Sequence, residues 1–527
     1  MARLMNEGER PEEVLKRYFG YDSFRTGQKK LVDSLLRGED VFGIMPTGAG
    51  KSICYQVPAL MFEGVTLVVS PLISLMKDQV AALNQAGIHA AYLNSSLTPR
   101  QYELALAYAT QGRYKIIYVA PERLLTKSFL QFAMQVEIPF VSIDEAHCVS
   151  QWGQDFRPGY LQIPEFIKRL PKRPILGAFT ATATEVVQKD VTALLGLLQP
   201  KQVVTGFDRP NLRFVVRRPK DKMTDLIRYV EKHEEESGVV YCISRKKVEE
   251  VCEKLKDRGY LATMYHAGLA DEVRQRNQED FIYDRAKIMV ATNAFGMGID
   301  KSDVRYVIHY NMPKNMESYY QEAGRAGRDG DEAECILLYG ASDMHTNQFL
   351  IDNNENPSLT EEELEEIKKR DEERLRKMRG YCFSKKCLRQ YMLGYFGEKS
   401  SGRCDHCSVC ESGPAVDERK MVYFEEDYGR ESWQDDRALA FPKKTEQPLS
   451  YEDRQLFEVL RQERNEIARS MGLPAYMVFM DKTLRDMSIK KPQTEKEMLK
   501  VHGVGESKCN LYGRRFIRCI HNYLSSQ

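Results

Sequence analysis

Short apolar runs alternate with longer segments of mixed polarity from about residue 40 to residue 340. The runs are rich in β-branched residues and lie at 41–45, 65–70, 115–120, 140–144, 175–181, 238–244, 287–293, 304–310 and 334–339. Continuous apolar strands separated by helices are typical of parallel sheets with both faces covered. So many strands favour two sheets over one, and the segment 205–214 (TGFDRPNLRF) is the predicted crossing point. The fold class is therefore α/β.

The pattern changes after residue 340. Residues 359–379 are predicted to form a highly charged helix, which by default is a solvated face. An irregular stretch runs to residue 447, and a compact helical region follows from residue 449. These changes predict units at 1–207, 208–342, 343–411 and 448–527, with a linker at 412–447.

The chain has 527 residues, which predicts three or four domains. No run of about 18 apolar residues is present, and residues 1–10 lack the apolar centre of a secretory signal. We therefore expect a monomeric cytoplasmic protein that has no membrane partner and is associated with the chromosome or nucleoid. Because the formal net charge is only +1, a nucleic-acid partner would have to be held by a local groove.

A phosphate-binding loop is predicted where the first apolar run ends, at PTGAGKS (46–52). Glycines such as Gly48 and Gly50 let backbone N–H groups face an anion, beside Thr47, while Lys51 reaches the terminal phosphates and Ser52 can ligate Mg²⁺. The strict motif has glycine where this chain has Met45. The alternative is a glycine turn that happens to precede Lys-Ser.

A second apolar strand ends in Asp144-Glu145-Ala-His147. Asp144 offers a hard oxygen ligand to Mg²⁺, and Glu145 is a candidate base for the attacking water. Alone, the motif could arise by chance, but with the phosphate-binding loop it predicts nucleoside triphosphate hydrolysis.

Two arginines three residues apart, Arg325 and Arg328, lie in QEAGRAGRDG (321–330). A guanidinium that reaches the γ-phosphate from a second domain would act as an arginine finger. The alternative is a pair of surface arginines beside a glycine turn. The first interpretation places ATP between the two sheets.

Together these motifs resemble superfamily 2 helicases, and specifically the RecQ family of DNA helicases. The similarity extends through FGYDSFRTGQ (19–28), SPLISLMKDQV (70–80), DEAHCVSQWGQDFRPGY (144–160), FTATAT (179–184), YHAGL (265–269), VATNAFGMGIDK (290–301) and YYQEAGRAGRDG (319–330). The resemblance implies two tandem RecA-like domains, a helical zinc-binding subdomain and an HRDC-like domain. It also implies site residues beyond those above: Tyr21, Arg25 and Gln28 for adenine, Asp300 for the nucleotide, Gln321 for catalysis, and His266 and Thr292 for DNA.

By the same resemblance, residues 147–160 form an aromatic-rich loop that couples single-stranded DNA to hydrolysis. A base stacked on Trp152 or Phe156 would contribute roughly 1 to 3 kcal/mol, and Arg157 could add a phosphate or cation–π contact. The alternative is that both aromatic side chains only pack the loop against the core.

A zinc site is predicted at Cys387, Cys404, Cys407 and Cys410, because four thiolates at this spacing build closed tetrahedral Zn²⁺ sites. The rival interpretation is a redox-active Cys-x-x-Cys pair. The other cysteines lie singly among apolar residues, where small buried side chains are expected.

The resemblance fails between residues 411 and 447, where the family usually has a winged-helix domain. Thirty-seven residues are too few for one, and ten acidic against six basic residues have the wrong sign for gripping phosphates. The strand-separating hairpin and the docking site for single-stranded DNA-binding protein are therefore not expected.

In the HRDC-like region, backbone amides at Gly503–Gly505 and the side chains of Lys508, Arg514 and Arg515 could bind DNA weakly. The alternative is a glycine turn between packed helices.

These observations predict an ATP-dependent DNA helicase that uses ATP, Mg²⁺ and Zn²⁺, with 3′ to 5′ movement on single-stranded DNA implied by resemblance, in repair, recombination or replication. Two rivals within enzymes are an RNA helicase and a translocase that does not separate strands. A third is a strand-annealing factor for which ATP is a release switch.

Overall fold

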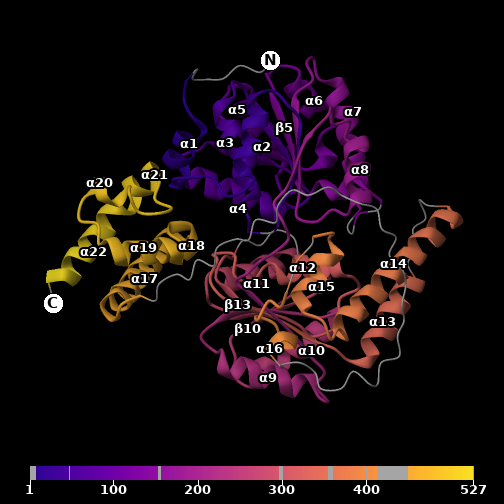
Figure 1. Cartoon of the computed structure of the whole chain (residues 1–527). Coiled ribbons are helices and arrows are strands. Elements are labelled where there is room, and N and C mark those ends of the chain that lie inside the picture. Colours follow the sequence, from indigo (N-terminus) through magenta and orange to yellow (C-terminus); the bar gives the residue numbers. More distant parts are fainter. Residues whose placement is uncertain are drawn as a thin grey trace.

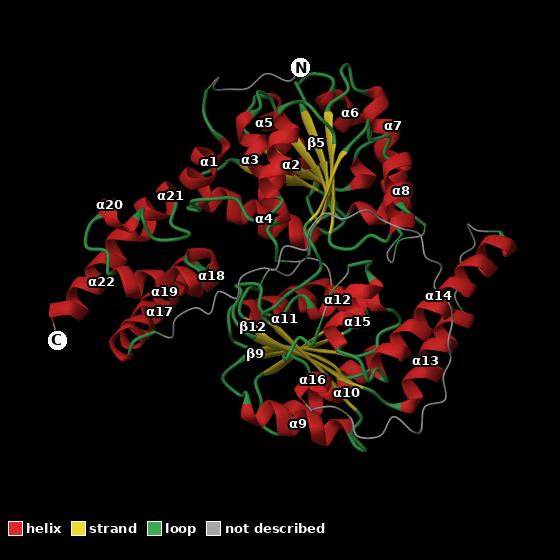
Figure 2. Cartoon of the chain, in the orientation of Figure 1, coloured by secondary structure: helices red, strands yellow, loops and turns green. Residues whose placement is uncertain are grey.

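The computed structural model describes residues 8–46, 48–151, 153, 156–295, 301–353, 360–398, 400, 402–411 and 449–525. Within these residues the chain forms two separate sheets, one of seven strands and one of six, in which every strand pair is parallel. Helices cover both faces of each sheet (Figures 1 and 2). The predicted two-sheet α/β fold is therefore confirmed.

The first lobe is built on the sheet with strand order β3-β4-β2-β5-β6-β1-β7. Its strands are β1 (Val41–Ile44), β2 (Thr66–Val69), β3 (Ala90–Leu93), β4 (Ile116–Val119), β5 (Phe140–Ile143), β6 (Ile175–Thr180) and β7 (Lys201–Val204). Its helices are α1 (Pro11–Val14), α2 (Gln28–Leu36), α3 (Lys51–Met61), α4 (Ile73–Gln85), α5 (Pro99–Thr110), α6 (Lys127–Ala133), α7 (Gln162–Arg169) and α8 (Glu185–Leu194). Shorter turns are η1 (Leu15–Phe19), η2 (Pro121–Arg123), η3 (Ala146–Val149) and η4 (Pro158–Leu161).

The second lobe is built on the sheet with strand order β10-β11-β9-β12-β13-β8. Its strands are β8 (Leu212–Arg217), β9 (Ser237–Tyr241), β10 (Ala262–Tyr265), β11 (Ile288–Ala291), β12 (Val304–His309) and β13 (Ala333–Leu338). Its helices are α9 (Lys222–Lys232), α10 (Arg245–Lys256), α11 (Asp271–Ile282), α12 (Met316–Ala323) and α13 (Ala341–Asp352), with the turn η5 (Asn293–Phe295). Residues 205–211 connect the two sheets, within the predicted crossing point; we call them the hinge.

Four strands were not predicted from the apolar runs: β3, β7, β8 and β10. All four are edge strands, two in each sheet. An edge strand is covered less completely than a central one, so it does not need a continuous apolar run. The clearest case is β7, in which only Val203 is buried.

Many helices begin at a side chain that accepts a hydrogen bond from a backbone N–H of the first turn. Such caps satisfy donors that have no partner within the helix. The capping residues include Thr98, Asp221, Ser244, Asn315, Thr360, Ser450 and Thr494.

The cysteine-containing region packs against the second lobe. It comprises α14 (Glu361–Cys382), α15 (Leu388–Tyr395) and α16 (Ser408–Glu411). The backbone of Cys407 forms an isolated bridge with Phe214 of β8. The predicted charged helix corresponds to α14, and it is not merely solvated, because Arg370 donates a hydrogen bond to the Gln151 carbonyl of the first lobe at 3.1 Å.

The C-terminal helical region (449–525) docks beside α1 and α4 of the first lobe (Figure 1). It comprises α17 (Tyr451–Met471), α18 (Ala475–Val478), α19 (Asp481–Lys490), α20 (Glu495–Met498), α21 (Glu506–Lys508), η7 (Cys509–Gly513) and α22 (Arg514–Ser525). Across the contact, the Gly503 N–H donates to the Gly20 carbonyl at 2.9 Å, and Tyr512 and Ser507 both donate to Gln85. Among the described residues, no helix is both long and apolar enough to cross a membrane.

We predict that Gly505→Leu releases the C-terminal helical region from the first lobe. A β-carbon at Gly505 would lie 2.8 Å from the carbonyl oxygens of Arg17 and Tyr18, whereas its φ of −89° suits any residue. Small-angle X-ray scattering should show a larger maximum dimension, and hydrogen exchange at residues 15–21 should accelerate. Glu506→Leu, at the exposed neighbouring position, is the control. A scattering curve identical to that of the unmodified chain would contradict this docking contact.

Candidate ATP and zinc sites

The phosphate-binding loop connects β1 to α3, so its backbone N–H groups lie at a helix N-terminus. Gly48 and Gly50 have φ values of +83° and +80°, which residues with a β-carbon rarely adopt. Lys51 is the first residue of α3, and Ser52 follows it. A helix N-terminus preceded by such a turn is an anion-binding site. Thr47 lies outside the described residues.

Two of the residues predicted to bind adenine hold this loop. The side-chain amide of Gln28, which is 3% exposed, donates to the carbonyls of Ala49 and Gly50 at 3.1 and 3.0 Å. Arg25 donates to the Gly48 carbonyl at 2.6 Å, and its own N–H donates to Gln28. In this structure they therefore support the phosphate-binding loop; their predicted contact with adenine stays a prediction.

The carboxylates lie at the carboxyl end of β5, beside the phosphate-binding loop. Glu145 is 3.2 Å from the Lys51 ammonium. Burial, together with the Glu145 carboxylate, raises the pKa of Asp144 to about 6. Burial alone would raise the pKa of Glu145 as well, but Lys51 and His147 hold that pKa below its ordinary value. The site thus keeps one carboxylate ionised beside the lysine.

A chain of polar contacts leads from Glu145 to the second lobe. His147 lies 3.4 Å from Glu145, and its Nδ1 is 2.8 Å from the Thr180 hydroxyl. The Thr180 hydroxyl donates to the Thr182 carbonyl, and Gln321 of α12 donates to the Thr182 hydroxyl at 3.4 Å. Gln321, which the resemblance assigned to catalysis, therefore contacts the first lobe directly.

The arginines lie in residues 324–331, which we call the arginine loop. A β-carbon added to Gly48 would be 3.7 Å from the Cα of Arg328, so the arginine loop lies against the phosphate-binding loop. The charge of Arg325 contributes to the low pKa of Glu145. The Nε of Arg325 is buried and has no hydrogen-bond partner among the described residues. A buried guanidinium with an unused donor fits an anionic ligand at this seam.

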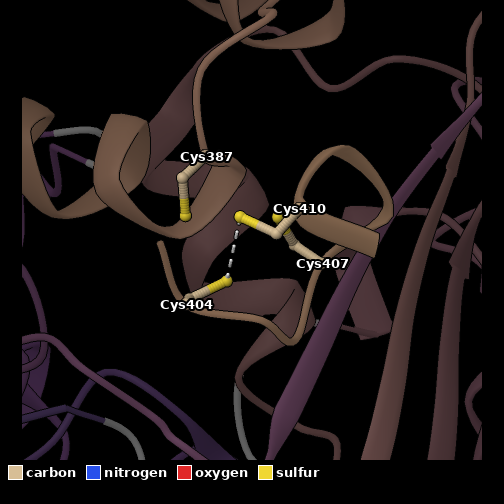
Figure 3. A group of neighbouring side chains, drawn as sticks. All are labelled: Cys387, Cys404, Cys407 and Cys410. Carbon is tan, nitrogen blue, oxygen red and sulfur yellow. Dashed lines mark hydrogen bonds between the residues drawn. The ribbon is translucent and has the colours of Figure 1, made fainter. Parts of the chain in front are cut away.

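The four predicted zinc ligands lie together (Figure 3). The sulfur atoms of Cys387, Cys404, Cys407 and Cys410 are all within 4.8 Å of one another. Tetrahedral coordination with Zn–S bonds of about 2.3 Å places sulfurs about 3.8 Å apart, and the Cys404 and Cys410 sulfurs are 3.9 Å apart. The donor set therefore fits a structural Zn²⁺ ion. Neither Cys382 nor His406 belongs to this group.

Comparison with sequence families assigns the same order of regions. A DEAD/DEAH box helicase family matches residues 25–190, and a helicase conserved C-terminal domain matches 221–330. RecQ zinc-binding matches 341–411, and the HRDC domain matches 453–520. The chain thus combines a helicase core with a RecQ zinc-binding region and an HRDC domain.

Curated relatives match nearly end to end. The ATP-dependent DNA helicase RecQ of Bacillus subtilis (strain 168) is 39% identical, over 98% of this chain and 99% of the relative. That of Haemophilus influenzae is 36% identical, over 97% and 95%. The chain belongs to the RecQ family of ATP-dependent DNA helicases. The Bacillus alignment spans 591 positions against 527 residues here, so this RecQ protein lacks counterparts of some residues of its relative.

Solved helicase structures share the fold of this RecQ protein. The crystal structure of the DUF1998 helicase MrfA bound to DNA superposes with a TM-score of 0.53, at 19% identity, over 64% of this chain and 52% of that one. At this identity the match supports the two-lobed architecture only.

The aromatic-rich loop of this RecQ protein is closed at its base. The Arg157 N–H donates to the Cys148 carbonyl at 2.9 Å, and a β-carbon on Gly153 would meet the His147 carbonyl at 2.4 Å. The loop therefore starts directly beside the histidine that contacts Glu145. Arg157 is partly committed within the protein, because its guanidinium donates to the Pro71 carbonyl at 3.0 Å. Phe156 is half-buried, and Trp152 lies outside the described residues.

Two residues that the resemblance assigned to DNA are buried. His266 is 3% exposed, accepts the Gly268 N–H, and lies 3.3 Å from Glu249. Thr292 is 8% exposed at the end of β11. Direct contact with DNA would require both side chains to become exposed, so these contacts stay predictions. Asp300 lies outside the described residues.

The HRDC region uses its glycine turn for docking, not as a free phosphate cradle. The Gly503 N–H is bonded to Gly20, and the Lys508 ammonium donates to the Met477 carbonyl, where burial lowers its pKa to about 8. Arg514 pairs with Glu495. Tyr21, predicted to contact adenine, faces His502 with ring centroids 5.2 Å apart. The docked arrangement thus uses the Gly503 N–H and the Lys508 ammonium within the protein, while Arg514 and Arg515 remain exposed; weak DNA binding by this region stays a prediction.

We predict that Cys407→Ser removes bound zinc and destabilises the region around α15 and α16. Losing one of four ligands leaves an incomplete site, and loss of a structural metal costs about 4 kcal/mol or more. Zinc content by atomic absorption and the thermal unfolding temperature should both fall. Cys382→Ser changes a buried cysteine outside the cluster and should retain zinc. Equal zinc content in both variants would show that the cluster is not the zinc site.

Proposed function

We propose that this RecQ protein hydrolyses ATP to move 3′ to 5′ along single-stranded DNA and to unwind duplexes. The observation that carries the proposal is the seam between the lobes. There the phosphate-binding loop and Glu145 of the first lobe meet Gln321 and the arginine loop of the second. A nucleotide bound at this seam contacts both lobes, so its cleavage changes the force that holds them together.

Each polar residue of the seam has a role that its position supports. The amides around Thr47, Gly48 and Gly50 would hold phosphates, and Lys51 would neutralise them. Ser52 and Asp144 would hold Mg²⁺, which when bound neutralises charge on the phosphate oxygens. Glu145 would orient and deprotonate the attacking water. Gln321, Arg325 and Arg328 would then stabilise charge that develops on the transferred phosphoryl group.

Adenine recognition is proposed for the segment that supports the phosphate-binding loop. Tyr21, Arg25 and Gln28 precede and begin α2, next to Gly48 and Gly50. Asp300 would complete the nucleotide site from the second lobe. Binding through this segment favours ATP over GTP.

DNA coupling is proposed for the aromatic-rich loop. Its base lies beside His147, so a change of loop conformation caused by a stacked base would reach Glu145 through one residue. Trp152 and Phe156 would stack on bases, and Arg157 would contribute charge. His266 and Thr292 would join them only on exposure. In the rival interpretation, the protein translocates or anneals strands. It would use the same site but would not separate the strands of a duplex.

We propose a monomer associated with the nucleoid, acting in repair, recombination or replication. A docking site for single-stranded DNA-binding protein is not part of the proposal, because the winged-helix domain that usually carries it is not expected in the short 412–447 segment. That segment lies outside the described residues.

The first test compares duplexes that carry a 3′ or a 5′ single-stranded tail. We expect ATP-dependent unwinding of the 3′-tailed substrate only.

Lys51→Ala should lower ATP hydrolysis and unwinding by about 10²–10³-fold, because charge stabilisation at the phosphates is lost. Lys168→Ala, an exposed lysine of α7, is the control. Unwinding that survives Lys51→Ala would refute the assignment, and hydrolysis without strand separation would favour the translocase or annealing rival.

The second test concerns the aromatic-rich loop. Losing a stacking contact of roughly 1 to 3 kcal/mol should weaken single-stranded DNA stimulation of the ATPase about 5- to 150-fold in Trp152→Ala. Basal ATPase should stay near the unmodified rate. Phe349→Ala removes an exposed aromatic ring on α13 and serves as the control. Equal losses of basal and stimulated ATPase would indicate that Trp152 only packs the loop.

A further inference from the structure

Two side chains of the hinge contact a segment that is distant in the sequence. Its sequence, TGFDRPN (205–211), is the covalent connection between β7 and β8, and it contains Arg209 and Asn211. A connection between two lobes needs only to span them. Here both side chains turn instead towards the arginine loop, which lies more than a hundred residues later in the chain.

Arg209 binds the backbone of the arginine loop at three points. Its guanidinium donates to the carbonyls of Gly324, Ala326 and Gly327 at 3.2, 3.0 and 2.8 Å. These carbonyls alternate with the two arginines: Gly324 precedes Arg325, and Gly327 precedes Arg328. The planar fork of a guanidinium suits this, because several donors in fixed directions can hold several acceptors at once.

Asn211, two residues after Arg209, binds the same loop. Its side-chain amide donates to the carbonyls of Gly327 and Asp331 at 2.9 and 2.8 Å, and its own carbonyl accepts the Ala333 N–H. The loop turns sharply here, since Gly327 has a φ of +54° and a β-carbon on it would lie 2.5 Å from the Asn211 amide nitrogen. The Gly327 carbonyl is thus held by both hinge residues.

The hinge is in turn held by the zinc-binding region. Arg389 of α15, two residues after the ligand Cys387, forms an ion pair with Asp208 and donates to the carbonyls of Arg209 and Leu212 at 2.8 and 2.6 Å. The Phe207 ring stacks on Phe396, with centroids 4.7 Å apart. Arg209 and Asn211 therefore project from a backbone that is fixed on its far side.

Arg209 also lies next to the phosphate-binding loop. A β-carbon added to Gly48 would be 3.4 Å from its Nη1. One side chain therefore lies between the loop that binds phosphates and the loop that carries the proposed arginine fingers. Loss of the Arg209 and Asn211 donors would therefore free the arginine loop beside the phosphate-binding loop.

We propose that Arg209 and Asn211 are positioning residues that set the reach of Arg325 and Arg328 towards the γ-phosphate. The inference rests on the proposed role of those two arginines. Neither hinge residue donates to the reacting atoms in this account. Both act by holding the carbonyls between which the arginine side chains project. The arginine loop therefore keeps its place beside the phosphate-binding loop only while these donors hold it.

The test replaces the donors while keeping the size of each side chain. Arg209→Lys keeps the charge but cannot hold three carbonyls, and Asn211→Asp replaces the donating nitrogen with an oxygen that repels them. A displacement of about 1 Å lowers the rate of a positioned reaction by about 10²-fold. We expect kcat for ATP to fall by roughly that factor in either variant, with KM within about twofold of the unmodified value.

A second measurement separates positioning from support of the fold. Affinity for a non-hydrolysable ATP analogue should be retained, whereas trapping of ADP with aluminium fluoride, which mimics the transferred phosphoryl group, should be lost. Arg213→Lys is the matched control, because Arg213 lies next to the hinge but pairs with Glu334 and Glu411. It should behave as the unmodified chain does. If Arg209→Lys does not fold, the Asn211→Asp result decides.

A combined variant distinguishes failure of this inference from failure of the proposed function. In a chain that carries Arg325→Ala and Arg328→Ala, adding Asn211→Asp should lower kcat no further, because the hinge acts only through these arginines. If the arginine replacements leave kcat unchanged, the proposed role of the arginine loop is wrong. If they lower kcat but the hinge variants do not, or if the losses multiply, the hinge residues are not positioning residues.

Discussion

Positive charge from both lobes converges on one seam, and the closed arrangement depends on how that charge is neutralised. The cationic groups are Arg25, Lys51, Arg209, Arg325 and Arg328, and the nearby carboxylates are Asp144 and Glu145. Burial lowers the pKa of Arg209, and the nearby charges of Arg328 and Arg25 lower it further. Like charges brought together in this way repel each other. A bridging polyphosphate would turn this repulsion into attraction, so in the proposed function the lobes approach each other most favourably with nucleotide between them.

The apolar runs in the sequence predicted the central strands but not the edge strands, because edge strands are more exposed to solvent. Strands such as β5 and β6 are buried on both faces, so all their residues are apolar or small and the pattern is unmistakable. The edge strand β7 is exposed at three of its four positions, so its sequence pattern resembles that of a polar connecting segment. Its place in the sheet is set by pairing with β1, a long-range contact that local composition does not record.

The candidate site was predictable where chemistry requires a fixed spacing along the chain. Lys51 and Glu145, and the four zinc ligands, follow from such motifs. The contributions of Gln28 and Arg209 did not, because both act by binding carbonyl groups that any residue possesses. Because every residue has a backbone carbonyl, the sequence does not show which carbonyl groups a side chain such as Gln28 or Arg209 will bind. The motifs of His266 and Thr292 likewise did not indicate that both side chains are buried.

The HRDC region contacts the two lobes unequally. Towards the first lobe it packs closely through the backbone of Gly503 and Gly505. Towards the second lobe, its contacts within the described residues include a hydrogen bond from Tyr283 to the Gly472 carbonyl and a 3.5 Å ion pair between Arg485 and Asp331. Partly exposed ion pairs of this kind contribute about 0 to 1 kcal/mol. If the HRDC region stays on the first lobe, separation of the lobes exposes the surface of the second lobe around Tyr283 and Asp331 to solvent.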